Sequence, residues 1–416
     1  MNSVPKHRPK KICMLAYTGY ECDNRVRRYA EALVKRGDEV DVFALATGNF
    51  PIGVDRIAGV TLYRIQHRDF VEKYKLSYLW RLLRFLLVSS FLIARRHYRL
   101  RYDLIHIHNV PDFLVFAAWY PKLTGVKLIL DIHDIVPEFF SSKFGISESS
   151  LYVKLLKNLE RASAKFVDHV IVSNDLWRDK LISRSVAAEK CSVFINHVDP
   201  SIFYRRTRTR SDDAVIILFP GTFQAHQGLD IAIQAFSYLQ ERLPQAELHL
   251  YGGGGVEAEL RKQAERLGLN TRIKFLAGVS LDEVADVMAN ADVGIVPKRA
   301  NSFGNEAYST KIMEFMSQGL PVVASRTKID TFYFDESVVH FFTDGDARAM
   351  AAAVLEVLEN EALRGELIRN GYDYVEQHNW ERRKREYLDL VDSLVTNDST
   401  PRMGASSNIT VASAAK

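Results

Sequence analysis

Short apolar segments alternate with amphipathic segments over most of the chain. Residues 12–16 form a predicted buried strand, residues 25–36 a predicted helix and residues 40–46 the next strand. A second series of the same kind begins with a strand at residues 215–220. Strands that alternate with helices favour parallel sheets with helices on both faces. Because 416 residues are too many for one ordinary core, the alternation predicts two doubly wound α/β domains of comparable size.

The composition is that of a soluble globular protein, with 47% hydrophobic and 25% charged residues. A net charge of +4 is too small to indicate a nucleic-acid partner. The three cysteines are odd in number and lack metal-ligand spacing, which favours a reducing compartment. The basic N-terminal residues are followed by an apolar segment that fits a first strand better than a signal peptide. We therefore expect a cytoplasmic protein.

One short acidic motif suggests a metal at first sight. Asp344 and Asp346 flank a glycine, as in a metal-binding D-x-D sequence, but they precede an alanine-rich helix at residues 347–359. Aspartates in that place are typical of helix caps and first-turn charges. The sequence therefore predicts no metal site, and we expect no cofactor.

The stretch at residues 297–325 carries the most informative functional pattern. Ser309 or Thr310 can cap a helix that begins near Lys311. The loop before this helix then directs free backbone N–H groups toward whatever lies above it. Such a helix start suits an anion, for example a diphosphate.

Two glutamates flank the predicted anion site. Glu306 lies in the loop, and Glu314 lies about one turn inside the helix. Two carboxylates beside an anion site suit a ligand that has both phosphates and hydroxyls, as a nucleotide sugar does. The alternative is a glutamate that only caps its own helix. A capping box needs Ser or Thr three residues before the Glu, where this chain has Lys311, so that alternative is weaker.

Glu306-x7-Glu314 followed by Gly-x-Pro-Val-Val resembles the E-x7-E motif of glycosyltransferase family 4, retaining enzymes of the GT-B fold. The resemblance implies that Glu306 contacts hydroxyls of the donor sugar, that Glu314 contacts the ribose, and that the amides between them hold the diphosphate. The family commonly has glycines after the first Glu, where this chain has Ala307 and Ser309. Residues 309–316 instead look like another version of the motif, S-x-K-x-x-E-[FY]-M.

Histidines and carboxylates end two predicted strands, at residues 103–108 and 127–133. Parallel sheets place their ligand sites at the carboxyl ends of strands, although a lone histidine is more often structural. By the resemblance, His133 matches the family's histidine beside the donor sugar. His106 and His108 look like the family's H-x-H, and we treat them as supporting residues.

Glycine turns follow several strands, and each can also be an ordinary tight turn. In the turn after residues 215–220 the family has Arg and Lys on the diphosphate, where this chain has Thr222 and Gln227. The available cations are Lys298, Arg299 and Lys311, and Lys311 is best placed because it opens the predicted helix. The predicted donor-binding residues are Gly19, Gly221, Thr222, Gly252, Gly254, Val279, Ser309, Thr310 and Glu314.

The segment at residues 77–101 is the most basic and apolar helix candidate. Its leucines at positions 79, 82, 83 and 86 make one stripe, and the arginines at 81, 84 and 95 fall on the other side. The helix either packs on the sheet with solvated arginines or also contacts an anionic membrane, where each basic residue contributes roughly 1 kcal/mol. The basic residues concerned are Arg81, Arg84, Arg95, Arg96, Arg99 and Arg101.

The resemblance implies a GT-B fold, in which two Rossmann-like domains face a central cleft. We expect an acceptor-binding domain at residues 1–206 and a nucleotide-sugar-binding domain at residues 207–376. We expect a closing helix at residues 377–396 that returns to the first domain, and a disordered tail at residues 397–416.

The predicted activity is retaining, metal-independent transfer of a sugar from a nucleotide-sugar donor to a lipid-linked saccharide in surface polysaccharide biosynthesis. Lys311 and the helix amides would stabilise the leaving diphosphate, while Glu306 and His133 would hold the sugar. Binding to the inner face of the plasma membrane would bring the enzyme to such an acceptor. One alternative is a nucleotide-sugar epimerase of similar shape. Another is a non-catalytic scaffold with a degraded donor site, which Thr222 and Gln227 suggest.

Overall fold

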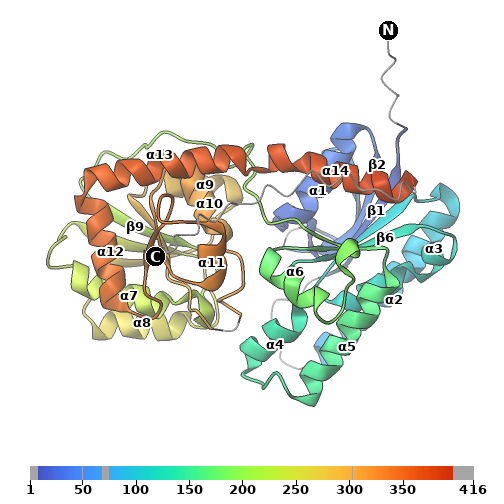
Figure 1. The fold of residues 1–416 in the computed structure, drawn as a ribbon, viewed down its shortest axis with the longest axis horizontal. Helices are drawn as coiled ribbons and strands as arrows, with labels where there is room; N and C mark the ends of the chain where they lie inside the picture. The colour runs from blue at the N-terminus through green and yellow to red at the C-terminus, as the bar shows by residue number, and fades with distance from the viewer. Residues whose placement is uncertain (1–7, 49, 68–74, 302, 397–416) are drawn as a thin grey trace, which may run out of the picture.

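Residues 8–48, 50–67, 75–301 and 303–396 are described by a computed structural model, in which the chain forms two α/β domains (Figure 1). Each domain has a twisted, mostly parallel sheet with helices on both faces. The predicted fold class is therefore confirmed. The predicted tail at residues 397–416 lies outside the described residues.

The first sheet has eight strands in the order β3-β4-β2-β1-β5-β6-β7-β8, and all neighbours are parallel except β3 and β4. Its strands are β1 (Lys11–Gly19), β2 (Glu39–Ala46), β3 (Gly53–Ile57), β4 (Val60–His67), β5 (Leu104–His108), β6 (Lys127–Ile132), β7 (His169–Val172) and β8 (Cys191–Val193). Its helices are η1 (Tyr20–Cys22), α1 (Asn24–Arg36), α2 (Lys75–Leu100), η2 (Asp112–Ala118), α3 (Trp119–Leu123), α4 (Val136–Phe144), α5 (Leu151–Phe166), α6 (Asp175–Ile182) and η3 (Ala188–Lys190).

The second sheet has six parallel strands in the order β11-β10-β9-β12-β13-β14. Its strands are β9 (Val215–Pro220), β10 (Ala246–Tyr251), β11 (Ile273–Leu276), β12 (Val293–Val296), β13 (Val322–Ser325) and β14 (His340–Phe342). The helices that follow β9 are η4 (Ala225–Gln227), α7 (Leu229–Leu239), α8 (Glu257–Arg266), α9 (Leu281–Ala289), α10 (Thr310–Ser317), α11 (Lys328–Tyr333), α12 (Ala347–Glu359), α13 (Glu361–Gln377) and α14 (Trp380–Thr396).

Helix α1 illustrates how local sequence sets the bounds of an element. The Asp23 carboxylate accepts the backbone N–H groups of Arg25 and Val26, which would otherwise lack partners at the helix start. At the other end Gly37 has a φ of 104°, a left-handed conformation that ends the helix and favours glycine. Asp346 caps α12 in the same way as Asp23 caps α1, which confirms its prediction as a cap.

Helix α14 lies on the N-terminal domain, beside α1, after α13 has run across the C-terminal domain (Figure 1). Trp380 and Tyr387 of α14 are buried in the core of the N-terminal domain. The centroid of the Tyr387 ring lies 4.2 Å from that of the Tyr29 ring, and the Tyr387 hydroxyl lies 2.9 Å from Nδ1 of His106. The chain therefore crosses between the domains a second time, and the crossing ends in buried contacts.

Helix α2 corresponds to the predicted basic helix, but its buried side agrees only in part with the predicted leucine stripe. Leu82 is buried as expected, together with Phe85 and Ile93. Leu79 and Leu83 are exposed, so their assignment to the buried stripe is wrong. The periodicity could not identify the buried face because apolar side chains occupy most of the helix circumference.

Tyr387 provides a test of the contact between α14 and the N-terminal domain. We expect Tyr387→Phe to lower the free energy of unfolding by about 1–3 kcal/mol, because buried Nδ1 of His106 loses its partner. Tyr387→Ala should lower it by about 3–5 kcal/mol, because it also leaves a cavity. Urea denaturation monitored by circular dichroism measures the free energy of unfolding of both variants.

The control is Arg385→Ala, at a solvent-exposed position on the same helix, and it should leave the stability unchanged. Equal stability of Tyr387→Phe and the unmodified protein would contradict the buried contact.

Candidate active site

A buried ion pair organises the carboxyl edge of the first sheet. Asp131, in β6, accepts from Arg25 of α1 at both oxygens, with Nε to Oδ2 at 2.8 Å and Nη2 to Oδ1 at 2.7 Å. Burial raises the pKa of Asp131, but the charges of Arg25 and His133 outweigh burial and hold the pKa well below its usual range. Asp131 is therefore an anion that is fixed in position.

His133 follows β6 directly and lies beside this anion. Its Nε2 is 3.3 Å from Oδ2 of Asp131 and 3.1 Å from Nδ1 of His108. Its backbone N–H donates to Oδ1 of Asn109 at 2.8 Å. The His133 side chain keeps 20% of its surface exposed, whereas His106 and His108 are buried. His133 is thus the accessible member of the histidine cluster, with Nε2 turned toward the interior.

His106, His108 and Asp131 place potential ligand atoms within 4.8 Å of one another, a spacing that a metal ion could use. Both oxygens of Asp131 already accept from Arg25, and the positive guanidinium opposes a second cation there. Burial also lowers the pKa of His106 and of His108 and favours their neutral forms, in which each ring can donate one hydrogen bond and accept another. We therefore interpret the cluster as a hydrogen-bond network that orients His133.

The predicted glycines of the second sheet bring two backbone turns into close contact. The Gly221 N–H donates to the Tyr251 carbonyl at 2.8 Å. A Cβ atom at Gly252 would lie 2.0 Å from the Gly221 oxygen, and a Cβ at Gly254 would lie 2.2 Å from the Phe223 oxygen. Packing alone therefore requires both glycines. The Thr222 side chain is exposed at the tip of the first turn.

Two further predicted donor-binding residues also lie after strands. Gly19 ends β1, and a Cβ atom there would lie 2.5 Å from the Thr47 hydroxyl oxygen. This close approach gives a structural reason for the glycine. Val279 follows β11 and exposes its side chain. A contact of either residue with a nucleotide sugar stays a prediction.

Lys311 lies in the first turn of α10 and extends across the Gly221 turn. Its Nζ is 5.0 Å from the centroid of the Phe219 ring. A Cβ atom at Gly221 would lie 2.7 Å from Cε of Lys311, so the missing side chain makes room for the lysine. Burial lowers the pKa of the Lys311 ammonium group below its ordinary value, although the charge of nearby Glu314 acts in the opposite direction. This arrangement brings a cation to the carboxyl edge of β9, where a parallel sheet binds its ligands.

The other two candidate cations, Lys298 and Arg299, already form ion pairs with aspartates. Lys298 is buried, and its Nζ contacts Oδ2 of Asp330 at 2.9 Å, Oγ of Ser309 at 2.7 Å and the Ala307 carbonyl at 2.6 Å. Its ammonium group thus has three partners, which is its full capacity. Arg299 pairs with Asp230. Of the three candidates, Lys311 therefore keeps the best position for an anionic ligand.

The start of α10 differs from the prediction in one respect. Ser309 precedes the helix, but its side chain makes no capping hydrogen bond, so the first of the two predicted caps, Ser309 or Thr310, is wrong. Its hydroxyl donates to Asp330 and accepts from Lys298. Thr310 is the first residue of the helix. Burial raises the pKa of the Glu314 carboxyl above its ordinary value, although the charge of nearby Lys311 acts in the opposite direction.

Glu306 lies in the loop before α10, as predicted, and its carboxylate reaches the N-terminal domain. Its Oε2 is 2.5 Å from Nζ of Lys180 on α6. Phe303, from the same loop, is buried against Phe139 and Trp177 of the N-terminal domain, with ring centroids 5.3 and 5.9 Å away. The loop that carries the first glutamate is therefore held between the two domains.

Two adjacent residues that follow β7 form hydrogen bonds to predicted site residues of both domains. Ser173 donates its hydroxyl to the His133 carbonyl at 2.9 Å. Asn174 donates its side-chain amide to the Glu306 carbonyl at 3.0 Å. His133 and Glu306, which belong to different domains, are thus tied to neighbouring positions of one backbone segment.

Sequence reasoning missed Ser173, Asn174 and Lys180 as site residues. Residues 170–174 are recognisable as a strand, and polar residues at its carboxyl end were a usable signal. The Lys180 contact has no local signal, because it joins residues 126 positions apart.

A surface cavity of about 540 Å³ lies away from these residues. It is lined by residues 205–208, in the linker between the last strand of the first sheet and β9, and by the end of α9, the turn after α10 and part of α13. Arg206 and Arg208 in its wall pair with Asp286 and Asp292. These ion pairs give the linker arginines a structural role, so we do not place the donor site there.

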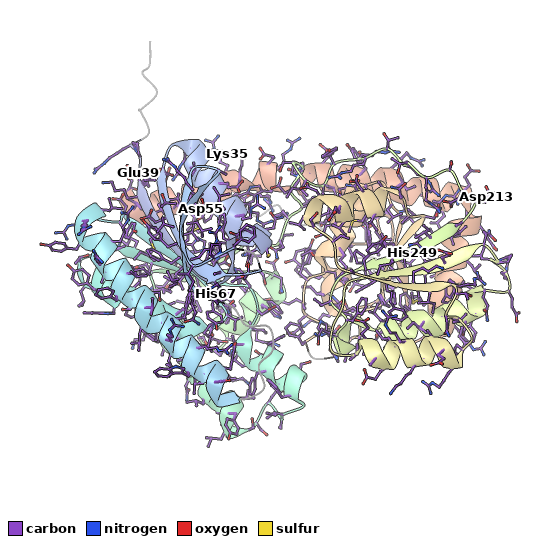
Figure 2. The ribbon with its side chains drawn as sticks, turned by 180° about the vertical axis from the view of Figure 1, so that it is seen from behind. Lys35, Glu39, Asp55, His67, Asp213 and His249 are labelled. Carbon is purple, nitrogen blue, oxygen red and sulfur yellow. The ribbon has the colours of Figure 1, made fainter. Side chains whose placement is uncertain are left out.

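His226, in η4, provides a probe of the position of Lys311. Burial, with the positive charges of Lys311 and Lys298, lowers the pKa of His226 to about 4. NMR titration should show this value in the free protein and a higher one in Lys311→Met, because a nearby cation has been removed. Lys35→Met is the control, because Lys35 lies exposed near the end of α1 (Figure 2), and it should leave the value unchanged. The same pKa for His226 in Lys311→Met and in the unmodified protein would contradict this placement of Lys311.

Comparison with known proteins identifies relatives for both domains. A family model described as a glycosyl transferase 4-like domain matches residues 22–197, and one described as glycosyl transferases group 1 matches residues 202–374. The amylovoran biosynthesis glycosyltransferase AmsK of Erwinia amylovora is 28% identical over 189 residues, 45% of this chain and 46% of AmsK. The chain therefore spans about half the length of that relative.

Two other similarities cover more of the chain. The phosphatidyl-myo-inositol mannosyltransferase of Mycobacterium tuberculosis is 31% identical over 289 residues, 67% of this chain and 70% of the mannosyltransferase. The structure of Anabaena HepE in complex with UDP-glucose has a TM-score of 0.69 at 18% identity, covering 92% of this chain and all of the HepE chain. With both domains matched by glycosyltransferase models, the chain belongs to the family 4 glycosyltransferases, which have the GT-B fold.

Proposed function

We propose that the protein binds a nucleotide sugar between its two domains and transfers the sugar to an acceptor. The main observation behind the proposal is the position of the Lys311 side chain, which extends from α10 across Gly221. A cation, a glycine turn and a helix N-terminus meet there at the carboxyl edge of the second sheet, and a diphosphate suits this combination. The UDP-glucose complex of HepE supports a donor of this class.

Four of the predicted residues have side-chain roles in this proposal. Glu306 and His133 hold the donor sugar, and Glu314 holds the ribose. Lys311 and the amides at the start of α10 stabilise the negative charge that grows on the diphosphate as its bond to the sugar breaks. Preorganised donors aimed at developing charge are usually the largest single contribution to catalysis. Lys311 in this way supplies the positive charge that a metal ion supplies elsewhere.

We propose that transfer retains the configuration at the anomeric carbon, as the family resemblance implies. The acceptor hydroxyl attacks the anomeric carbon on the face that the diphosphate leaves. A new carbon–oxygen bond forms as the bond to the diphosphate breaks, and the departing phosphate oxygen takes the hydroxyl proton. The reaction then needs no covalent sugar–protein intermediate.

We propose a lipid-linked saccharide as the acceptor, because helices of the N-terminal domain expose large apolar side chains. Trp80, Leu87 and Phe91 of α2 are 63%, 64% and 65% exposed, and Leu151 of α5 is 81% exposed. Helix η2 contacts both α2 and α5, so the two lie on the same side of the domain. Figure 2 shows α2 along the outer lower edge of this domain. We call the exposed side chains of α2 and α5 the apolar face, and a face of this kind suits a membrane surface.

Helix α2 contains a segment, Ser77–Leu100, that is long and apolar enough to cross a membrane by length and composition. One side of it, however, packs in the domain through Phe85, Ser89 and Ile93. Arg96 of this helix pairs with Asp41 at 2.9 Å. We propose that the helix lies on the inner face of the membrane and does not cross it. The similarity to an amylovoran biosynthesis glycosyltransferase and to a phosphatidyl-myo-inositol mannosyltransferase supports a polysaccharide or glycolipid product.

Incubation with radiolabelled UDP-glucose, UDP-galactose and GDP-mannose, together with a membrane lipid extract, tests the function. We expect label to move into the lipid fraction and Glu306→Ala to reduce this transfer at least 100-fold, because the donor sugar loses a charged hydrogen-bond partner. Glu336→Ala, which alters an exposed surface ion pair, is the matched control. An isomerised donor would indicate the epimerase, and binding without turnover would indicate the scaffold. Either result contradicts the proposal.

Vesicle co-sedimentation tests the apolar face. We expect binding to anionic vesicles that weakens with salt. Arg84→Ser with Arg95→Ser should weaken it about 30-fold, since each exposed basic residue contributes roughly 1 kcal/mol. Leu87→Ser with Phe91→Ser should abolish it. Phe332→Ser, at an exposed position on α11 of the other domain, should change nothing. Failure to bind at low salt would leave α2 a structural helix.

A further inference from the structure

We infer that Lys180 is a positioning residue for the reaction, and that α6 of the N-terminal domain holds the sugar-binding glutamate of the other domain in place. This inference rests on the proposed role of Glu306 and assigns a function in the reaction to a helix of the other domain. Figure 1 shows α6 on the side of its domain that faces the C-terminal domain.

The contact with the carboxylate is direct. Nζ of Lys180 lies 2.5 Å from Oε2 of Glu306, and the two side chains are 30% and 16% exposed. Hydrogen bonds between ionised groups are shorter and about twice as strong as neutral ones. In the part of the chain that the structure describes, no hydrogen bond to Oε1 of Glu306 is found. One oxygen is therefore fixed by Lys180, and the other remains for a sugar hydroxyl.

The same helix holds the backbone of the loop. Asn174 is fully buried, and its Oδ1 accepts the Trp177 N–H at 2.8 Å, which caps α6. Its Nδ2 donates to the Glu306 carbonyl at 3.0 Å. A single side chain thus fixes both the start of α6 and the loop position of Glu306, so Lys180 meets a carboxylate whose backbone is already placed.

Two more contacts secure the arrangement on either side. Trp177 packs against Phe303 of the glutamate loop, with ring centroids 5.9 Å apart. The Tyr333 hydroxyl of α11 lies 2.7 Å from Oδ2 of Asp175 and accepts the Asp175 N–H at 2.9 Å. Residues 174–180 therefore contact the C-terminal domain at a carbonyl, a carboxylate, an aromatic ring and a hydroxyl. Lys180 is the member of this set whose contact reaches the proposed substrate-binding atoms.

The position of Lys180 predicts a selective kinetic effect. Without the ammonium group, the Glu306 side chain can rotate away from the sugar, while the phosphate contacts at Lys311 and Gly221 are untouched. Loss of Lys180 should therefore weaken recognition of the sugar and leave binding of the nucleoside diphosphate unchanged. It should also reduce discrimination between donors that differ at a single hydroxyl, such as UDP-glucose and UDP-galactose.

Kinetics of Lys180→Met and Lys180→Arg test the inference, with UDP-glucose, UDP-galactose and GDP-mannose as donors. For the best of these donors we expect Lys180→Met to lower kcat/KM about 10- to 100-fold, because a charged hydrogen bond is lost. Its affinity for UDP or GDP by calorimetry should match the unmodified protein. Lys180→Arg should recover most of the activity, since it restores an N–H donor and a charge. Lys180→Gln provides a second neutral variant should the Met variant fold poorly.

Arg178→Met is the matched control. Arg178 lies two residues earlier on α6, has the same 30% exposed side chain as Lys180, and donates to the Cys191 carbonyl of its own domain. If Lys180→Met keeps normal kcat/KM while Glu306→Ala is inactive, the inference is overturned and the proposed function stands. If Glu306→Ala is also active, the role of Glu306 in the proposed function fails together with the inference. Equal losses in Lys180→Met and Arg178→Met would likewise overturn it.

Discussion

The ion pair between Arg25 and Asp131 holds the half of the site that the N-terminal domain contributes. Both side chains are almost fully inaccessible, and the guanidinium also donates to the Phe194 carbonyl at 2.7 Å. Removing one partner of a buried pair is strongly unfavourable, because the other charge is left uncompensated. The pair thereby joins α1, β6 and the segment after β8. His133 takes its orientation from the carboxylate at the centre of this cluster.

The other half of the site depends on contacts of two kinds between the domains. The buried contact of Tyr387 with His106 ties α14 firmly to the first sheet. The ion pair of Lys180 with Glu306 is partly exposed, so solvent can replace it at much smaller cost. The two domains are therefore joined by a buried contact at α14 and by a partly exposed ion pair at the loop before α10.

The order of strands and helices was sufficient to predict both parallel sheets, because apolar strands buried on both faces differ clearly from amphipathic helices. The sequence also predicted that Glu306 lies in the loop before α10 and Glu314 inside that helix, as the structure shows. Long-range packing was beyond such reasoning. Ser309 was one of two residues expected to cap α10, but its hydroxyl donates to Asp330, 21 positions away. The exposed face of α2 was not identified either, because apolar side chains outside the predicted leucine stripe occupy much of the helix circumference.

The glycine turns show the same limit in another way. Gly252 and Gly254 were predicted as nucleotide contacts, and the structure gives each a packing reason that holds without a nucleotide. Gly221 differs, because the space above it is taken by the Lys311 side chain. A pattern of glycines therefore predicts where two backbone segments approach closely. The neighbouring side chains are needed to tell whether a glycine serves packing or leaves room for a ligand-binding side chain.

Calorimetric titration of UDP and GDP into the unmodified protein and into Lys311→Ala tests the central claim most directly, that a cation above Gly221 binds a diphosphate. Lys328→Ala, at an exposed lysine at the start of α11, is the control. We predict that at least one nucleotide binds, that Lys311→Ala weakens it about tenfold or more through loss of a charged contact, and that Lys328→Ala does not. Equal affinity in Lys311→Ala and the unmodified protein would contradict the account.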